Sequence, residues 1–148
     1  MRRFGISCLF VIAAVSLLPA QTPRTIEIEA QDTMKWNVTK ITAKPGEALR
    51  IKLTSKGVIP KVAMAHNFVL LAPGTDAAAL VKAGSNSRDT DYIPVAEKAK
   101  VLAMTGLAGP GETVEVTFKV PSAPGTYEFI CSFPGHYTLG MKGTLTVK

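Results

Sequence analysis

Segments in which apolar and polar residues alternate one by one recur along the chain, and they restrict the fold more than any other feature. Examples are residues 49–53, 114–120 and 144–147. A strand with this pattern presents one apolar and one polar face, which is typical of antiparallel strands covering a shared core. Residues 44–47 and 109–112, each with Pro-Gly at the centre, are turn sequences between such segments. The pattern predicts an all-β sandwich of short strands.

One stretch departs from the alternation. Residues 76–83 are rich in helix-forming residues, Thr75 or Asp76 is available as an N-cap, and Gly84 follows as a stop signal. We expect one short helix in a flap that packs against one end of the sandwich, rather than a functional lid. A length of 148 residues suits a single domain.

The N-terminal 20 residues are typical of a secretory signal peptide. Arg2 and Arg3 precede a mostly apolar run, residues 4–18, and Ala20 is a small residue suitable for cleavage. The run has about 15 residues, fewer than the roughly 20 that a membrane-spanning helix requires, although an uncleaved anchor is the alternative. We therefore expect residues 1–20 to be removed and residues 21–148 to form a domain that is periplasmic or otherwise exported, without stable membrane insertion.

Charge and motifs exclude several classes of protein. Lys and Arg outnumber Asp and Glu by 17 to 11, but the basic residues are spread along the chain rather than clustered with aromatic residues, so nucleic acid is not an expected partner. The sequence contains no Gly-rich phosphate loop, no paired carboxylates with an obvious cleft, and no Ser-His-Asp set if both of its histidines bind metal. We expect a binding or carrier protein rather than an enzyme.

The cysteine count is informative. Only Cys8 and Cys131 occur, and Cys8 lies in the predicted signal peptide, so the exported domain has a single cysteine. An unpaired cysteine in an exported domain is a reactive thiol, an intermolecular bridge or a metal ligand, with an inert buried thiol as the plain alternative.

The residues around this cysteine favour a metal ligand. Cys131, His136 and Met141 follow one another with four residues between each pair, and His66 is the only other histidine. If the sandwich brings His66 beside this loop, two imidazoles, a thiolate and a thioether converge. That set is typical of a mononuclear type 1 (blue) copper site, with the thioether as a weak axial ligand. Zinc is the chief rival because it accepts His and Cys, but a thioether is a poor zinc ligand.

At this level of detail the chain resembles the cupredoxins, and most of all the azurins and auracyanins. The resemblance covers nearly the whole mature chain and is strongest in residues 64–70, 91–92, 111–112, 131–136 and 141–145. It implies an eight-stranded Greek-key β-sandwich with copper at one end. It also implies that His66, Cys131 and His136 are the equatorial ligands and Met141 the axial ligand.

Two further residues gain a role from the resemblance. The backbone carbonyl of Ala65 matches one that lies opposite the axial methionine in azurins, where glycine is usual. Asn67 matches an asparagine that fixes the thiolate and ties the two ligand loops together. The chain departs from azurins in having four rather than three residues between His136 and Met141, and in lacking a cysteine for their structural disulfide.

We interpret the protein as a monomeric one-electron carrier that cycles one copper between Cu(I) and Cu(II). The edge of His136 is the expected electron exit, within an exposed apolar docking patch for transient redox partners of the cytochrome or membrane-oxidoreductase class. The alternative function is copper storage or delivery. The expected docking patch consists of Met64, Phe133, Pro134, Tyr137 and Leu139.

Overall fold

The computed structural model of the protein describes residues 22–148. The predicted signal peptide, residues 1–20, and the start of the predicted domain at residue 21 lie outside the described residues. None of the helices within residues 22–148 is long and apolar enough to cross a membrane.

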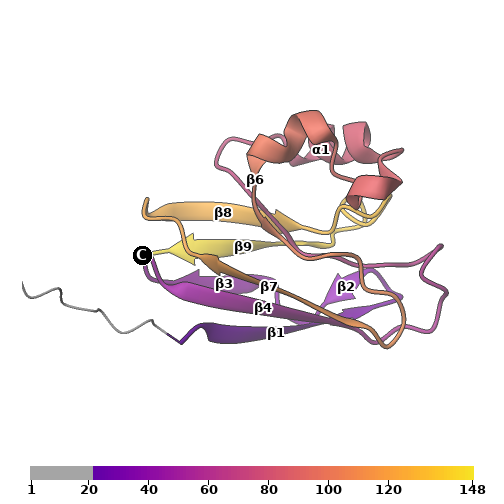
Figure 1. Cartoon of the computed structure of the whole chain (residues 1–148), viewed down its shortest axis with the longest axis horizontal. Coiled ribbons are helices and arrows are strands. Elements are labelled where there is room, and N and C mark those ends of the chain that lie inside the picture. The colour runs from indigo at the N-terminus through magenta and orange to yellow at the C-terminus, as the bar shows by residue number, and fades with distance from the viewer. Residues whose placement is uncertain (1–21) are drawn as a thin grey trace, which may run out of the picture.

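Two β-sheets pack face to face, as Figure 1 shows. One sheet has the strand order β2-β1-β4-β7 and the other has the order β3-β9-β8-β5-β6. The strands are β1 (Arg24–Gln31), β2 (Lys35–Trp36), β3 (Lys40–Ala43), β4 (Ala48–Ser55), β5 (Val69–Leu71), β6 (Val101–Met104), β7 (Thr113–Lys119), β8 (Gly125–Ile130) and β9 (Lys142–Val147).

The predicted all-β sandwich is confirmed, with two corrections. Residues 22–148 contain nine strands rather than eight, because the chain turns tightly at Met34 and the two residues of β2 pair with Ala30 and Gln31 at the end of β1. The sheets are also mixed rather than purely antiparallel. β3 belongs to the opposite sheet, so the chain leaves the first sheet after β2 and returns to it at β4. As a result β1 and β4 run parallel to each other. β3 and β9 in the other sheet are also parallel.

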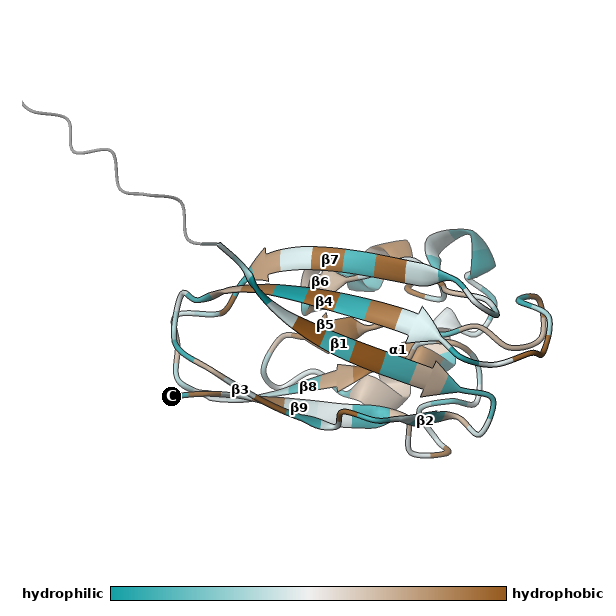
Figure 2. Cartoon of the chain, turned by 90° about the horizontal axis from the view of Figure 1, so that it is seen from below, coloured by the Kyte–Doolittle hydropathy of each residue, from teal (hydrophilic) through white to brown (hydrophobic). Residues whose placement is uncertain are grey.

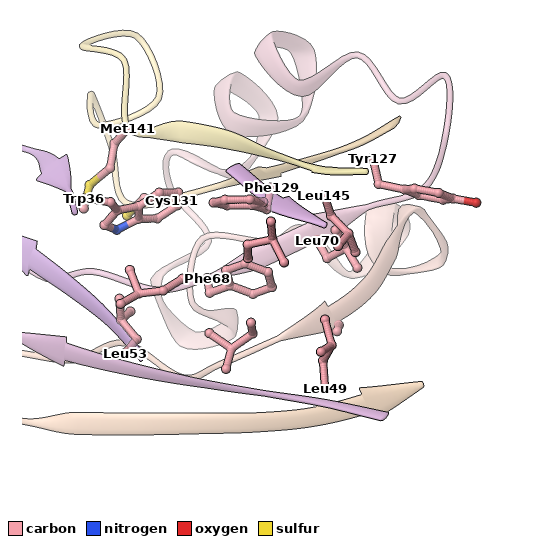
Figure 3. Packing of buried hydrophobic residues seen from close by; sticks show 14 of the residues in the cluster. Trp36, Leu49, Leu53, Phe68, Leu70, Tyr127, Phe129, Cys131, Met141 and Leu145 are labelled. Atoms are coloured by element: carbon pink, nitrogen blue, oxygen red, sulfur yellow. The ribbon is translucent and has the colours of Figure 1, made fainter. Parts of the chain in front are cut away.

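The alternation of the sequence becomes the two faces of each strand. In β4, Leu49, Ile51 and Leu53 are fully buried while Arg50 is exposed, and Figure 2 shows the corresponding bands of colour along β1, β4 and β7. The inward residues of both sheets meet in one core. Figure 3 shows Phe68 and Phe129 at its centre, with Cys131 and Met141 at one end.

The predicted helix is α1 (Ala77–Gly84), and its N-cap is Asp76, whose Oδ1 accepts a hydrogen bond of 2.9 Å from the backbone N–H of Ala79. The helix is followed by two short 3-10 helices, η1 (Arg88–Thr90) and η2 (Val95–Lys100). Leu80 of α1 belongs to a second apolar cluster with Val69 of β5 and Ile130 of β8. The flap therefore covers the outer face of the five-stranded sheet, above β8 and β9 in Figure 1.

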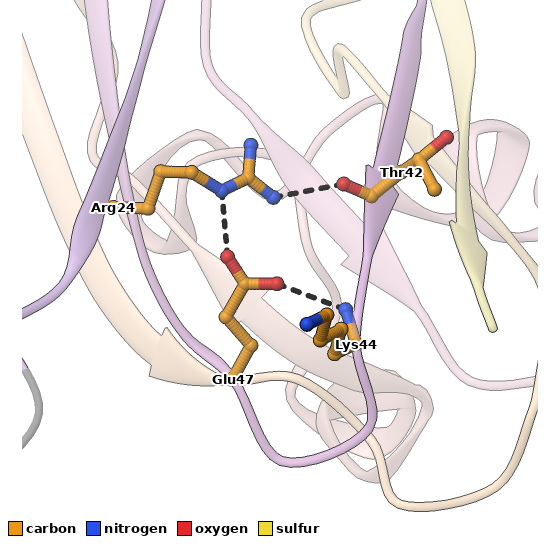
Figure 4. A network of polar contacts seen from close by, with 4 residues as sticks. All are labelled: Arg24, Thr42, Lys44 and Glu47. Carbon is orange, nitrogen blue, oxygen red and sulfur yellow. Dashed lines mark hydrogen bonds and ion pairs between the residues drawn. The ribbon is translucent and has the colours of Figure 1, made fainter.

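A polar network fastens the sandwich at the end where β9 terminates. Arg24 of β1 donates to Glu47 Oε1 at 2.6 Å and to the carbonyl oxygen of Thr42 in β3 at 2.8 Å, while Glu47 Oε2 accepts from the backbone N–H of Lys44 (Figure 4). Arg24, then the Lys44 N–H, hold the pKa of the Glu47 carboxyl below its usual value. The network joins strands of the two sheets and leaves the opposite end, where β9 begins, for the 131–141 loop.

Candidate metal centre

The four predicted ligands come from two segments at the same end of the sandwich. Cys131, His136 and Met141 lie in the loop between β8 and β9, and His66 lies just before β5. The backbone of His66 pairs with Ala108, donating to its carbonyl at 3.0 Å and accepting from its N–H at 2.8 Å. This isolated bridge, rather than a longer strand beginning at residue 66, holds His66 in place.

Backbone hydrogen bonds fold the 131–141 loop on itself. Cys131 donates to the carbonyl of Met141 at 3.1 Å, Met141 donates to His136 at 3.0 Å, and His136 donates to Phe133 at 3.1 Å. Gly135 has a φ of 85°, a conformation that favours glycine, so the chain can turn immediately before His136. These bonds bring residues five apart in the sequence to one place and leave the loop little freedom.

The donor atoms of three residues converge. One ligand atom each from His66, Cys131 and His136 lie within 4.8 Å of one another, and Cys131 Sγ is 3.5 Å from His136 Nδ1. The two imidazole rings have their centroids 5.0 Å apart. Met141 is also buried, and Figure 3 shows its thioether at the same end of the core as Cys131. The structure thus brings together the donor types that the sequence pattern indicated.

Both imidazoles are withdrawn from water. His66 is 0% exposed and His136 is 2% exposed. Within residues 22–148, neither ring nitrogen of His66 has a hydrogen-bond partner, although buried polar groups are nearly always paired. Burial lowers the pKa of His66, and burial followed by the nearby His66 lowers the pKa of His136 to about 4. Both rings are therefore neutral at neutral pH, the form that binds a metal.

Cys131 is fully buried, and burial raises the pKa of its thiol to about 12. The backbone N–H groups of Asn67 and Phe133 act in the opposite direction because they face the sulfur and favour the thiolate. The carbonyl oxygen of Ala65, the predicted further ligand, lies 4.0 Å from Cys131 Sγ. A bound metal cation would stabilise the thiolate form of Cys131 in this apolar position, because its positive charge offsets the negative charge of the sulfur.

The chemistry of the donors fits copper. Two imidazole nitrogens, one thiolate and the thioether of Met141 are the donor types that would hold copper in a type 1 site, where a thioether serves as a weak axial ligand. The unpartnered nitrogens of His66 indicate that these donors serve something other than hydrogen bonding within the protein.

A buried polar network supports the ligands, and of its members the sequence analysis singled out only Asn67. Asn67 Oδ1 accepts from the backbone N–H of Ser132 at 2.9 Å, and Asn67 Nδ2 donates to Ser132 Oγ at 2.8 Å. Ser132 Oγ in turn donates to the carbonyl of Asp91 at 2.7 Å. These bonds join the segments that carry His66 and Cys131, and the role of Asn67 in fixing the thiolate stays a prediction. Ser132 and Asp91 carried no local signal, because their partners are 41 or more residues away in the sequence.

The predicted docking patch is only partly exposed. Leu139 is 55% exposed, Pro134 is exposed, and Met64 and Tyr137 are half-buried. Phe133 is a correction: it is 8% exposed, because its ring packs between Tyr92, at a centroid distance of 5.1 Å, and His136, at 4.8 Å. Its ring therefore packs against the His136 side chain instead of lying on the surface.

Comparison with known proteins agrees with this description. A family model for copper-binding proteins of the plastocyanin/azurin family matches residues 24–148. Auracyanin-B of Chloroflexus aurantiacus is 38% identical over 135 residues, which span 90% of this chain and 54%, about half, of that protein. Azurin of Pseudomonas aeruginosa is 33% identical over 151 residues, which span 100% of this chain and 99% of that protein.

Solved structures show the same likeness. The structure of auracyanin A from Chloroflexus aurantiacus, a blue copper protein, matches with a TM-score of 0.76 and 36% identity, covering 86% of this chain and 100% of that one. A reduced auracyanin from Roseiflexus castenholzii matches with a TM-score of 0.74 and 32% identity, covering 84% of this chain and 96% of that one.

Proposed function

Because the chain belongs to the plastocyanin/azurin family of copper-binding proteins, we propose that it is a blue copper protein that carries single electrons between redox partners. The observation that carries this proposal is the buried cluster in which donor atoms of His66, Cys131 and His136 lie within 4.8 Å of one another. When bound there, copper supplies a one-electron couple between Cu(I) and Cu(II).

We assign His66, Cys131 and His136 as equatorial ligands and Met141 as the axial ligand, with the Ala65 carbonyl as a further backbone donor facing the site. Imidazole suits Cu(II), whereas thiolate and thioether suit Cu(I), so the mixture is acceptable to both oxidation states. A ligand set that suits both states needs little rearrangement when an electron moves.

The protein holds the donor atoms in fixed positions and keeps water away from them. The loop bonds among Cys131, His136 and Met141 and the clamp between Asn67 and Ser132 fix the donors before metal binds. The exposure of the three main donors is 2% or less, which supports the exclusion of water from the site. Without water as an added ligand, the coordination number can remain the same in both states.

Electrons are proposed to pass through His136, since its neighbours in the loop reach the surface. Pro134 and Leu139 are exposed, Tyr137 and Met64 are half-buried, and further exposed apolar side chains precede Met64, namely those of Val58, Ile59 and Val62. A small apolar patch suits brief docking, because weak redox encounters bury little surface. The proposed partners are redox proteins of the cytochrome or membrane-oxidoreductase class, and the protein is proposed to act as a monomer.

Export is a separate proposal that rests on the sequence of residues 1–20. The basic Arg2-Arg3 pair, the apolar run and Ala20 support cleavage of a signal peptide and location in the periplasm or another exported compartment. Mass measurement of the mature protein tests this: a first residue at or close to Gln21 is expected, and retention of residues 1–20 would contradict it.

Voltammetry of the copper-loaded protein, followed by a chelator challenge in each oxidation state, tests electron transfer against copper storage or delivery. We expect a reversible one-electron wave and copper that stays bound in both states. An absent wave, or copper that is extracted readily after reduction, would favour storage or delivery instead.

A further inference from the structure

A groove lies between helix α1 and the 131–141 loop, next to the candidate metal centre. Its volume is about 540 Å³, within the range of recesses that bind ligands. The helix and the residue after it form one wall, and the loop with the start of β9 forms the other. The lining residues are Ala78, Val81, Lys82, Ser85, Pro134, Gly135, Tyr137, Thr138 and Lys142.

The groove is positively charged. Lys82 and Lys142 line it, no Asp or Glu does, and within residues 22–148 neither lysine takes part in an ion pair. By contrast, six other basic residues are paired with carboxylates on the same molecule. Lys142 Nζ lies 4.8 Å from the centroid of the Tyr137 ring, so its charge is held over the groove wall. Because Lys82 and Lys142 have no carboxylate partner, the groove favours an anionic ligand.

The rest of the lining is apolar or small. Ala78, Val81, Pro134 and Tyr137 add carbon surface to a lining that also holds the two lysines. Most of the lining residues are exposed, so the groove is open to solvent rather than an enclosed cavity. An open groove with cations and an apolar floor fits an extended peptide segment that carries carboxylates and at least one apolar side chain.

The position of the groove connects it to the metal centre. Gly135 and Tyr137, which line it, are the two sequence neighbours of the proposed ligand His136. An occupant of the groove therefore lies beside the proposed electron exit. We propose that the groove receives an acidic, partly apolar segment of the redox partner and orients that partner over His136. This inference rests on the proposed electron-transfer function.

Nuclear magnetic resonance titration of the Cu(I)-loaded full domain tests the proposal. The probe is a short synthetic peptide of alternating Glu and Leu, compared with the same peptide bearing Lys in place of Glu. We expect the acidic peptide to shift the amide signals of residues 78–85 and 135–142 at low ionic strength, and the basic peptide to leave them unchanged. Raising the salt concentration should weaken the shifts because the attraction is electrostatic.

Charge variants sharpen the test. Lys82→Glu combined with Lys142→Glu should weaken acidic-peptide binding roughly tenfold or more, and the Gln versions should weaken it less. Lys119→Glu is the control for the single reversals Lys82→Glu and Lys142→Glu, because Lys119 pairs with Ala48 in the four-stranded sheet and does not line the groove. It is also free of ion pairs among the described residues. It should change binding little.

Peptide-induced shifts confined to residues outside the groove would overturn the proposal. So would equal weakening of peptide binding by Lys119→Glu and by reversal of one groove lysine. If inorganic phosphate alone produced the same shifts, the groove would be a small-anion site and the proposal would also be overturned. Failure of the proposed function would be recognised separately, through an absent reversible copper couple in the unmutated protein. If the protein showed that couple but bound no acidic peptide, only the proposed role of the groove would be refuted.

Discussion

Asn67 and Ser132 form a reciprocal pair of buried hydrogen bonds, in which Asn67 Oδ1 accepts from the Ser132 backbone N–H at 2.9 Å and Asn67 Nδ2 donates to Ser132 Oγ at 2.8 Å. Each residue directly follows a proposed copper ligand, His66 or Cys131. The pair therefore sets the distance between the two ligand segments, and Ser132 extends the connection to the flap through the carbonyl of Asp91.

Replacing Asn67 with Ala should loosen this connection. The change leaves the buried backbone N–H of Ser132 without its acceptor and removes the Asn67 Nδ2 donor from the Ser132 hydroxyl, which keeps its bond to the Asp91 carbonyl. We therefore expect the free energy of unfolding to fall by about 1–3 kcal/mol. Urea titration of the metal-free protein measures this. Thr138→Ala, on the exposed part of the same loop, is the control and should change stability by less than about 0.5 kcal/mol. Equal effects of the two changes would show that Asn67 does not brace the site.

The metal-free protein should lose stability as the pH falls. The pKa of His136 is about 4 in the folded state and near 6.5 when unfolded, so between these values the unfolded chain binds more protons. The free energy of unfolding should therefore decrease as the pH is lowered from about 6.5 to about 4, by on the order of 3 kcal/mol for this residue. His66, whose pKa is also lowered by burial, acts in the same direction.

Urea titrations in the presence of a chelator, at about pH 7 and about pH 4.5, measure this loss. The variant His136→Gln should show a smaller loss, because it lacks one of the two buried imidazoles. If the unmutated protein were equally stable at both pH values, the two rings would not be held neutral by burial.

Met141→Leu should preserve the fold and the colour of the copper-loaded protein while raising its reduction potential. Loss of the weak axial donor lowers the coordination number, which Cu(I) tolerates better than Cu(II), so the reduced state is favoured. Leu has a similar volume to Met, so the cost in stability should remain below about 1.5 kcal/mol. Voltammetry and thermal unfolding of the same sample measure both quantities. A potential equal to that of the unmutated protein would mean that Met141 is not the axial ligand.

Copper should stabilise the folded state, because the donor atoms of the site lie close together only when the chain is folded. At a free copper concentration about 1,000 times the Kd, the expected gain in the free energy of unfolding is about 4 kcal/mol. Thermal unfolding with and without a chelator measures it. Cys131→Ser is the comparison and should gain far less, since it lacks the thiolate; an equal gain in both proteins would place the metal elsewhere.

The parts of the fold that could be predicted are those with local causes. The alternation in Leu49, Ile51 and Leu53 identified a strand with one buried face, and Asp76 before an alanine-rich stretch identified the helix. The parallel pairing of β1 with β4 could not be predicted, since it depends on where the chain crosses between sheets. The two-residue strand β2 was missed because so short a segment carries no periodicity.

The same distinction holds for the site. His66, Cys131, His136 and Met141 could be selected because residues with these donor types are few in the chain, and the structure brings the first three together. The clamp through Ser132 and the carbonyl of Asp91 depends on contacts between distant segments. Phe133 was placed on the surface from its loop position, whereas packing against Tyr92 and His136 draws its ring inside.

Titration of the purified, metal-free domain with Cu(II), followed by visible and electron paramagnetic resonance spectra, tests the central claim most directly. We predict that one equivalent of copper produces an intense thiolate-to-copper band and the narrow hyperfine splitting of a type 1 site. Cys131→Ser should remain folded and lack the band. A colourless copper complex of the unmutated protein, or an intense band retained in Cys131→Ser, would contradict the account.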